Sequence, residues 1–217
     1  MAEPQTARFY PVLEERINIL SHAAGFVLST LALALLVTRA VNHGTAWHIV
    51  SAAVYGLSMM GLYAASTMYH SASDPAARAK LRIVDHASIY VLIAGTYTPF
   101  MLITLHGTVG WVIFGISWSM AVTGITLKLF FTGRFNLLST LMYVFMGWLI
   151  IFAIKPLVAS ISAQGLFWVI AGGVSYTVGA ILYSIKSIPY NHAIFHLLVL
   201  AGSICHFIAI YDYVLPH

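Results

Sequence analysis

The sequence predicts an all-α integral membrane protein whose helices form a seven-transmembrane bundle. Of its 217 residues, 60% are hydrophobic and only 7% are charged, whereas about a quarter of the residues in a soluble globular domain are charged. The apolar residues also fall into long runs, each near the ~20 residues that a helix needs to cross ~30 Å of hydrocarbon. Composition and run length together argue against a water-soluble fold.

Seven apolar stretches define the expected spans, and short connections separate them. The third and fourth stretches are divided only around Gly107 and Gly110, which are poor helix formers and therefore favour two helices over one. The first sixteen residues lack the order of a signal peptide and are expected to remain as a tail. The expected organisation is a cytoplasmic tail at 1–16 and a transmembrane domain at 17–217, with spans at 17–39, 46–71, 83–105, 109–131, 136–154, 164–186 and 192–214.

The Lys and Arg residues are distributed unequally between the two ends of these spans. Cytoplasmic loops are enriched in Lys and Arg, so an amino terminus in the cytoplasm leaves only Arg39 and Lys155 on the outer side. Trp47, Trp111 and Trp168 begin spans on that outer side, as interfacial tryptophans do. We therefore expect a cytoplasmic amino terminus and an extracytoplasmic carboxy terminus. The basic residues assigned to the cytoplasmic side are Arg8, Arg16, Arg78, Lys80, Arg82, Lys128, Arg134 and Lys186.

The net charge of +4 gives no support to nucleic-acid binding, because the basic residues are scattered between apolar runs. Membrane lipids are the expected partners. Gly172, Gly173 and Gly179 make the sixth span suitable for close helix contact, either within the bundle or between protomers of a homo-oligomer.

Ionisable side chains inside spans are energetically costly and mark function or internal pairing. The strongest signal is His192-Ala-Ile-Phe-His196, because a spacing of four residues puts both imidazoles on one helix face, ~6 Å apart. His70 is the natural third ligand, and three imidazoles suit Zn²⁺ better than Ca²⁺ or Mg²⁺. The alternative for the pair alone is hydrogen bonding to other helices. The ionisable residues expected at the inner end are His22, His70, Asp85, His86, His192 and His196.

Four further residues near these ligands have both a chemical and a structural interpretation. Asp85 is either a general base that positions water or a helix cap. Ser66, one helical turn before His70, could contact the metal-bound water or an oxyanion. His22 and His86 either support the ligands from behind or form hydrogen bonds between helices.

The start of the first span carries Glu14, Glu15 and Asn18, which either cap the helix or brace the metal site from below. His206 lies ten residues beyond His196, ~15 Å further along the helix. It is too far to share the metal, and we expect it to be buried and hydrogen-bonded.

These motifs resemble those of the hemolysin III family, the bacterial branch of the progestin and adipoQ receptor (PAQR) superfamily. The resemblance covers nearly the whole chain. It rests on Glu14-Glu15-Arg-Ile-Asn18 with Ser21-His22-Ala-Ala-Gly25, Ser66-Thr-Met-Tyr-His70-Ser71, Asp85-His86, Ala94-Gly-Thr-Tyr-Thr-Pro-Phe100, His192-Ala-Ile-Phe-His196 and Cys205-His206-Phe207.

The resemblance implies a multi-pass protein of the bacterial inner membrane with zinc held by His70, His192 and His196, and with Asp85 near the metal-bound water. Members of the superfamily and the related alkaline ceramidases look like membrane amidases. A zinc-dependent hydrolase of a lipid amide or ester, acting from the inner leaflet, is therefore the expected function. The alternative is a non-enzymatic cytolysin, pore-former or regulator of membrane fluidity or energetics, in which zinc is structural.

Overall fold

The computed structural model describes residues 8–131 and 136–217, which form helices and short connections with no β-strand among them. Seven helical segments are long and apolar enough to cross a membrane, counting α3 with η1 and α5 with η2 and α6. This confirms the predicted all-helical fold with seven candidate spans. The elements are α1 (Val12–His43), α2 (Ala46–Ser71), α3 (Pro75–Pro99), η1 (Phe100–Thr104), α4 (Thr108–Phe131), α5 (Asn136–Gly147), η2 (Leu149–Ala153), α6 (Ile154–Ser160), α7 (Ala163–Ser184) and α8 (Asn191–Tyr213).

Local sequence signals start several of these helices. The Asp74 carboxylate accepts a hydrogen bond from the Ala77 amide at 2.7 Å, and Pro75 occupies the first turn of α3; both features are favourable at a helix start. Ser162 caps α7 in the same way. The turn before α4 contains Gly107 with a φ of +89°, a conformation that glycine adopts without strain.

Two of the candidate spans contain a segment that is not α-helical. Pro99 ends α3, and the next five residues form the π-helix η1, where the Leu105 amide donates to the Phe100 carbonyl at 2.8 Å. The fifth span is interrupted between α5 and the 3₁₀-helix η2. There the Ile150 amide donates to the Tyr97 hydroxyl, which itself donates to the Gly147 carbonyl, both at 2.9 Å.

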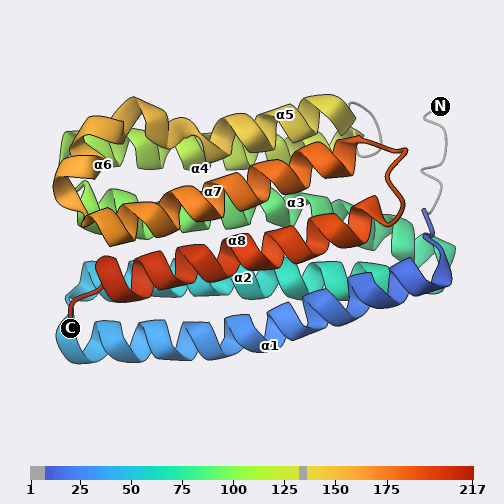
Figure 1. Ribbon diagram of the computed structural model, residues 1–217, viewed down its shortest axis with the longest axis horizontal. Helices are drawn as coiled ribbons and strands as arrows, with labels where there is room; N and C mark the ends of the chain where they lie inside the picture. Colours follow the sequence, from blue (N-terminus) through green and yellow to red (C-terminus); the bar gives the residue numbers. More distant parts are fainter. Residues whose placement is uncertain (1–7, 132–135) are drawn as a thin grey trace.

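The helices run side by side along one long axis, so that α1 begins at one end of the bundle and α8 ends at the other (Figure 1). α8 lies between α7 and the pair formed by α1 and α2 (Figure 1). Large apolar side chains such as Leu31, Val122 and Phe167 are exposed on the outside of the bundle, as expected of helices that face lipid. We call the end where α1, α3 and α8 begin the histidine end, because His70, His192 and His196 lie there.

Candidate metal centre

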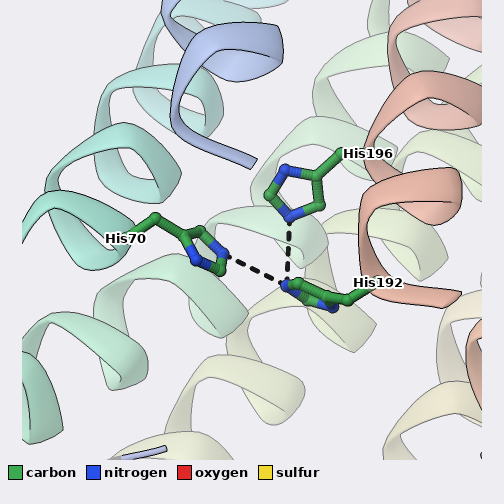
Figure 2. Close-up of side chains that lie close together, drawn as sticks. All are labelled: His70, His192 and His196. Atoms are coloured by element: carbon green, nitrogen blue, oxygen red, sulfur yellow. Dashed lines mark hydrogen bonds between the residues drawn. The ribbon is translucent and has the colours of Figure 1, made fainter. Parts of the chain in front are cut away.

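Three buried imidazoles from two helices converge at the histidine end. His70 is the second-last residue of α2, and His192 and His196 lie in the first two turns of α8. Figure 2 shows the three rings pointing at one another, with the Nε2 atom of His192 3.1 Å from the Nε2 atoms of both His70 and His196. One ligand atom from each residue lies within 4.8 Å of the others. The structure therefore brings together the three residues that the sequence predicted as ligands.

The protonation of this cluster fits a cation at its centre. The Nδ1 atom of His70 faces the Glu15 carboxylate, and the Nδ1 atom of His196 faces the Asn18 carbonyl, so each Nδ1 carries the proton. A neutral imidazole has only one N–H. The Nε2 atoms of His70 and His196 therefore carry no proton, and the lone pair of each is directed at the Nε2 atom of His192. A single proton on the Nε2 atom of His192 satisfies only one of them. A metal ion accepts all three lone pairs, and the donor set suits zinc and other transition metals rather than Mg²⁺ or Ca²⁺.

Two of the three nitrogen separations also fit a shared metal ion. A tetrahedral zinc ion with bonds of ~2.0–2.1 Å holds its ligand nitrogens ~3.3–3.4 Å apart. The two nitrogen separations that involve His192, 3.1 Å each, are close to that value, and all three ligand atoms lie within 4.8 Å of one another. His70 and His196 are each 2% exposed, so the site is shielded from bulk water.

A buried ion-pair network fixes the ring of His70. The Glu15 carboxylate accepts a hydrogen bond from its Nδ1 atom at 2.6 Å and also pairs with the Arg78 guanidinium. Carboxylates in this position orient a ligating imidazole and raise its basicity. Arg78 is 1% exposed. Its Nη1 group donates to three carbonyls at the end of α2, those of Tyr69, His70 and Ala72.

The residues just before and within the first turn of α1 cover the cluster. The Glu14 carboxylate accepts a hydrogen bond from the His192 amide at 3.2 Å. The Tyr10 ring stacks on the His192 ring with centroids 4.4 Å apart and an interplanar angle of 7°. Burial raises the pKa of Tyr10 well above its usual value, so its hydroxyl remains protonated. Of the two interpretations left open for Glu14, Glu15 and Asn18, these contacts favour a brace around the metal centre.

Asp85 and Ser66 lie in the wall of a cavity that also reaches two of the ligands. This cavity has a volume of about 320 Å³ and extends from His192 and His196 toward the far end of the bundle, a size typical of small-molecule sites. Asp85 and Ser66 are both buried, and the Ser66 hydroxyl lies close to the Asp85 carboxylate. Most other residues in the wall are apolar. The cavity therefore combines a polar end with a long apolar interior.

His22 and His86, the two other histidines predicted near the ligands, have different surroundings. The His22 ring stacks on the His196 ring with centroids 3.6 Å apart. Neither nitrogen of His22 has a hydrogen-bond partner within the described residues. His86 lines the cavity, and its buried Nδ1 atom also has no hydrogen-bond partner there. Hydrogen bonding between helices therefore does not explain His22, which instead packs behind a ligand.

His206 lies far from the ligands, as the sequence predicted. It is buried in the wall of the same cavity, and its Nε2 atom donates to the Val169 carbonyl at 3.1 Å. Ser203, nearby on α8, accepts a hydrogen bond from the Tyr63 hydroxyl at 2.7 Å and contacts the Tyr176 hydroxyl at 2.9 Å. These contacts tie α8 to α2 and α7.

The sequence did not reveal the burial or contacts of three residues, two near the metal centre and one in the cavity wall. Arg78 and Lys128 counted only as topological charges, and Tyr10 lay in the expected tail. The first two are buried at 1% and 3% exposure. Of the three residues, only Arg78 and Lys128 could have been recognised from the sequence, because a charged residue in or near a span is expected to have a buried partner or a function.

The comparisons with known proteins agree with the motifs. The chain matches the family described as Haemolysin-III related over residues 10–207. It is 48% identical to Hemolysin-3 of Bacillus cereus, covering 100% of this chain and 99% of that protein. It is also 48% identical to the Hemolysin-3 homolog of Bacillus subtilis (strain 168), covering 94% of this chain and 96% of that protein.

A distant relative comes from animals. The chain is 27% identical to the Monocyte to macrophage differentiation factor of Homo sapiens, over 97% of this chain and 89% of that protein. With the seven candidate spans and the three-histidine cluster, the matches assign the chain: it belongs to the hemolysin III family of membrane proteins.

Proposed function

We propose that this protein is a zinc-dependent hydrolase of a membrane lipid amide or ester. The observation that carries the proposal is the shared cavity, which brings the polar pair Ser66–Asp85 to the buried ligands His192 and His196. The excess of Lys and Arg at the histidine end supports its assignment to the cytoplasm. Substrate then enters from the inner leaflet of a bacterial plasma membrane.

His70, His192 and His196 hold the zinc ion in this proposal. When bound, zinc supplies Lewis acidity that lets water act as a nucleophile near neutral pH and polarises a carbonyl group. The Glu15 carboxylate keeps the Nε2 atom of His70 available as a ligand. The main-chain carbonyl of Asn18 likewise accepts the Nδ1 proton of His196 and leaves its Nε2 atom available as a ligand.

Asp85 is the general base. One of its carboxylate oxygens takes a proton from the attacking water and returns it to the leaving amine or alcohol. The Ser66 hydroxyl, which lies close to that carboxylate, helps to orient it. Its predicted contact with the oxyanion would require the hydroxyl to turn away from Asp85. The apolar wall holds the acyl chain and excludes bulk water, which strengthens electrostatic interactions at the polar end.

The names of the two Bacillus relatives support a second candidate function, lysis of cells by perturbation of a membrane. In that case zinc joins α2 to α8 and contributes folding free energy. Asp85 then has no chemical task.

Replacing Asp85 by Asn separates the two candidates. The Asp85→Asn variant should retain zinc and lose at least about a hundredfold in turnover of N-acyl and ester lipids, because general-base catalysis contributes roughly 10²–10⁴-fold. The measurements are zinc content by elemental analysis and product release by mass spectrometry. His192→Ala, which removes a ligand, should lose both zinc and turnover.

His206→Ala is the matched control, since it removes a buried histidine from the same helix outside the cluster. It should keep its zinc. A wild-type protein with zinc at full occupancy and no turnover on any lipid would refute the hydrolase and leave the structural role.

A further inference from the structure

A short segment before α1 lies over the histidine ligands. We call the residues Arg8, Phe9 and Tyr10 the strap. They belong to no helix, and Arg8 and Phe9 are exposed. The ring of Tyr10 reaches inward and stacks on the ring of His192, almost parallel to it. The strap therefore covers one of the three ligands directly.

A pocket that is open to solvent ends at this strap. The pocket has a volume of about 440 Å³, and its wall includes Tyr10, Glu14 and Asn191. The three histidine ligands are not among the described residues of its wall. His192 nevertheless lies directly behind it, since its ring contacts Tyr10 and its amide donates to Glu14. Tyr10 and Glu14 thus separate the water in this pocket from the ligands.

The larger cavity gives a metal ion no comparable approach. Away from Ser66 and Asp85 its wall is mostly apolar, and a hydrated cation would lose its water there at a high cost in free energy. The solvent-filled pocket is the more polar route. Arg8 and Lys186 also lie in its wall, so an arriving cation meets positive charge as well as the ring of Tyr10.

The contacts that hold the strap lie outside the helical hydrogen bonds. The Arg8 carbonyl accepts a hydrogen bond from the Nε atom of Arg78 at 2.8 Å and a longer one from the Tyr69 hydroxyl at 3.4 Å. The Arg78 guanidinium also lies over the Phe9 ring, 4.4 Å from its centroid. Non-helical segments near a chain end belong to the parts of a protein that open locally at low free energy. The strap can therefore open while α1 stays intact.

We infer that the strap is a gate for the metal ion, and that Tyr10 must move away from His192 before an ion can enter or leave the three-histidine site. Tyr10 contacts the face of the imidazole ring, so this contact requires no metal and closes the gate in both states. Loosening the strap should accelerate uptake and release alike and leave the equilibrium affinity nearly unchanged. The inference goes beyond the proposed function, because a structural zinc ion would pass the same gate.

The test measures both exchange rates on the full chain in detergent. Release is followed by mixing zinc-loaded protein with an excess of a chromophoric chelator. Uptake is followed by mixing metal-free protein with zinc and a fluorescent zinc indicator. Tyr10→Ala should accelerate both rates roughly tenfold, as expected for the loss of one stacked aromatic contact, and change the dissociation constant less than about threefold.

Three variants separate a gate from a general structural effect. Tyr10→Phe keeps the ring and should exchange zinc as wild type does. Phe9→Ala removes the aromatic contact with Arg78 that helps to hold the strap, and it should accelerate both rates severalfold. Tyr211→Ala removes a tyrosine that stacks on Phe207 near the far end of α8, and it should change neither rate.

Equal rates for wild type and Tyr10→Ala would overturn the inference. Faster release with unchanged uptake would also overturn it, because affinity would then fall in proportion and Tyr10 would only stabilise the bound ion. If Tyr10→Ala does not fold, the same two rates of Phe9→Ala decide. A wild type that takes up no zinc contradicts the gate as well, whereas zinc exchange without lipid turnover counts against the hydrolase alone.

Discussion

Glu15 is the residue on which the geometry of the metal centre depends most outside the ligands themselves. It holds His70 through the Nδ1 atom and is held in turn by Arg78 and, at 3.4 Å, by the Asn18 amide. Its side chain is 15% exposed, so the ion pair is largely shielded from solvent screening. Glu15 therefore fixes both the orientation and the protonation of one ligand.

Replacing Glu15 by Ala should lower zinc affinity about 10- to 100-fold, the usual effect of losing a hydrogen-bonded partner of a ligating histidine. Glu15→Gln should lose less, because its amide oxygen still accepts the Nδ1 proton of His70. Competition with a chromophoric chelator measures both. Equal affinities for wild type and Glu15→Ala would show that His70 is oriented by its helix alone.

The sequence predicted the three ligands from two simple facts, the i, i+4 spacing of His192 and His196 and the shared depth of His70. It left the role of Glu15 open and missed Tyr10 and Arg78. Spacing along a helix fixes which side chains share a face, whereas these contacts depend on how far a side chain reaches between elements. Tyr10 in particular contacts His192 across 182 positions of sequence.

At the scale of elements, α2 and α3 pack closely where Gly95 faces Ser58. A Cβ atom added to Gly95 would lie 2.7 Å from the Ser58 Cβ atom. Both residues are buried, and the Ser58 hydroxyl already donates to the Tyr55 carbonyl at 2.7 Å. The contact lets α3 bring Asp85 toward the α2 residues Ser66 and His70.

Gly95→Ala should therefore destabilise the bundle by about 1–3 kcal/mol, the usual effect of overpacking a core. Gly61→Ala is the matched control on α2, because a Cβ atom there meets nothing within 4 Å, and it should leave stability unchanged or raise it. Thermal unfolding in detergent measures both. A Gly95→Ala variant as stable as the control would show that α3 can shift without penalty.

The interruption of the fifth span shows what the sequence could not predict at this scale. The apolar run around 136–154 predicts a continuous helix. In the structure the Tyr97 hydroxyl bonds to backbone groups at Gly147 and Ile150, and the hydrogen-bond pattern changes to that of η2. The change depends on a tyrosine from α3, so the residues of the span do not encode it alone.

For the whole molecule, the long apolar runs were sufficient to predict an all-helical protein with seven candidate spans. Its orientation remains a prediction from the distribution of Lys and Arg. The metal centre offers a way to test it, because His70 and His192 lie at the ends of their helices. A zinc ion bound there, as proposed, would therefore be within reach of chelators from one aqueous side only.

A membrane-impermeant chelator should remove zinc from the protein in inside-out vesicles and leave it in intact spheroplasts, if the histidine end faces the cytoplasm. Zinc retained by the recovered protein is the readout, and detergent-solubilised protein defines complete removal. The reverse pattern would place the amino terminus outside.

The position of the ligands along the chain also determines when the centre can form. His70 belongs to the second span, whereas His192 and His196 belong to α8, which follows every other element that lines the cavity. During synthesis, Glu15 and Arg78 can hold His70 ready long before its partners leave the ribosome. If the cluster binds a metal ion, as proposed, that ion is captured only after α8 has arrived between α1 and α7, late in biogenesis.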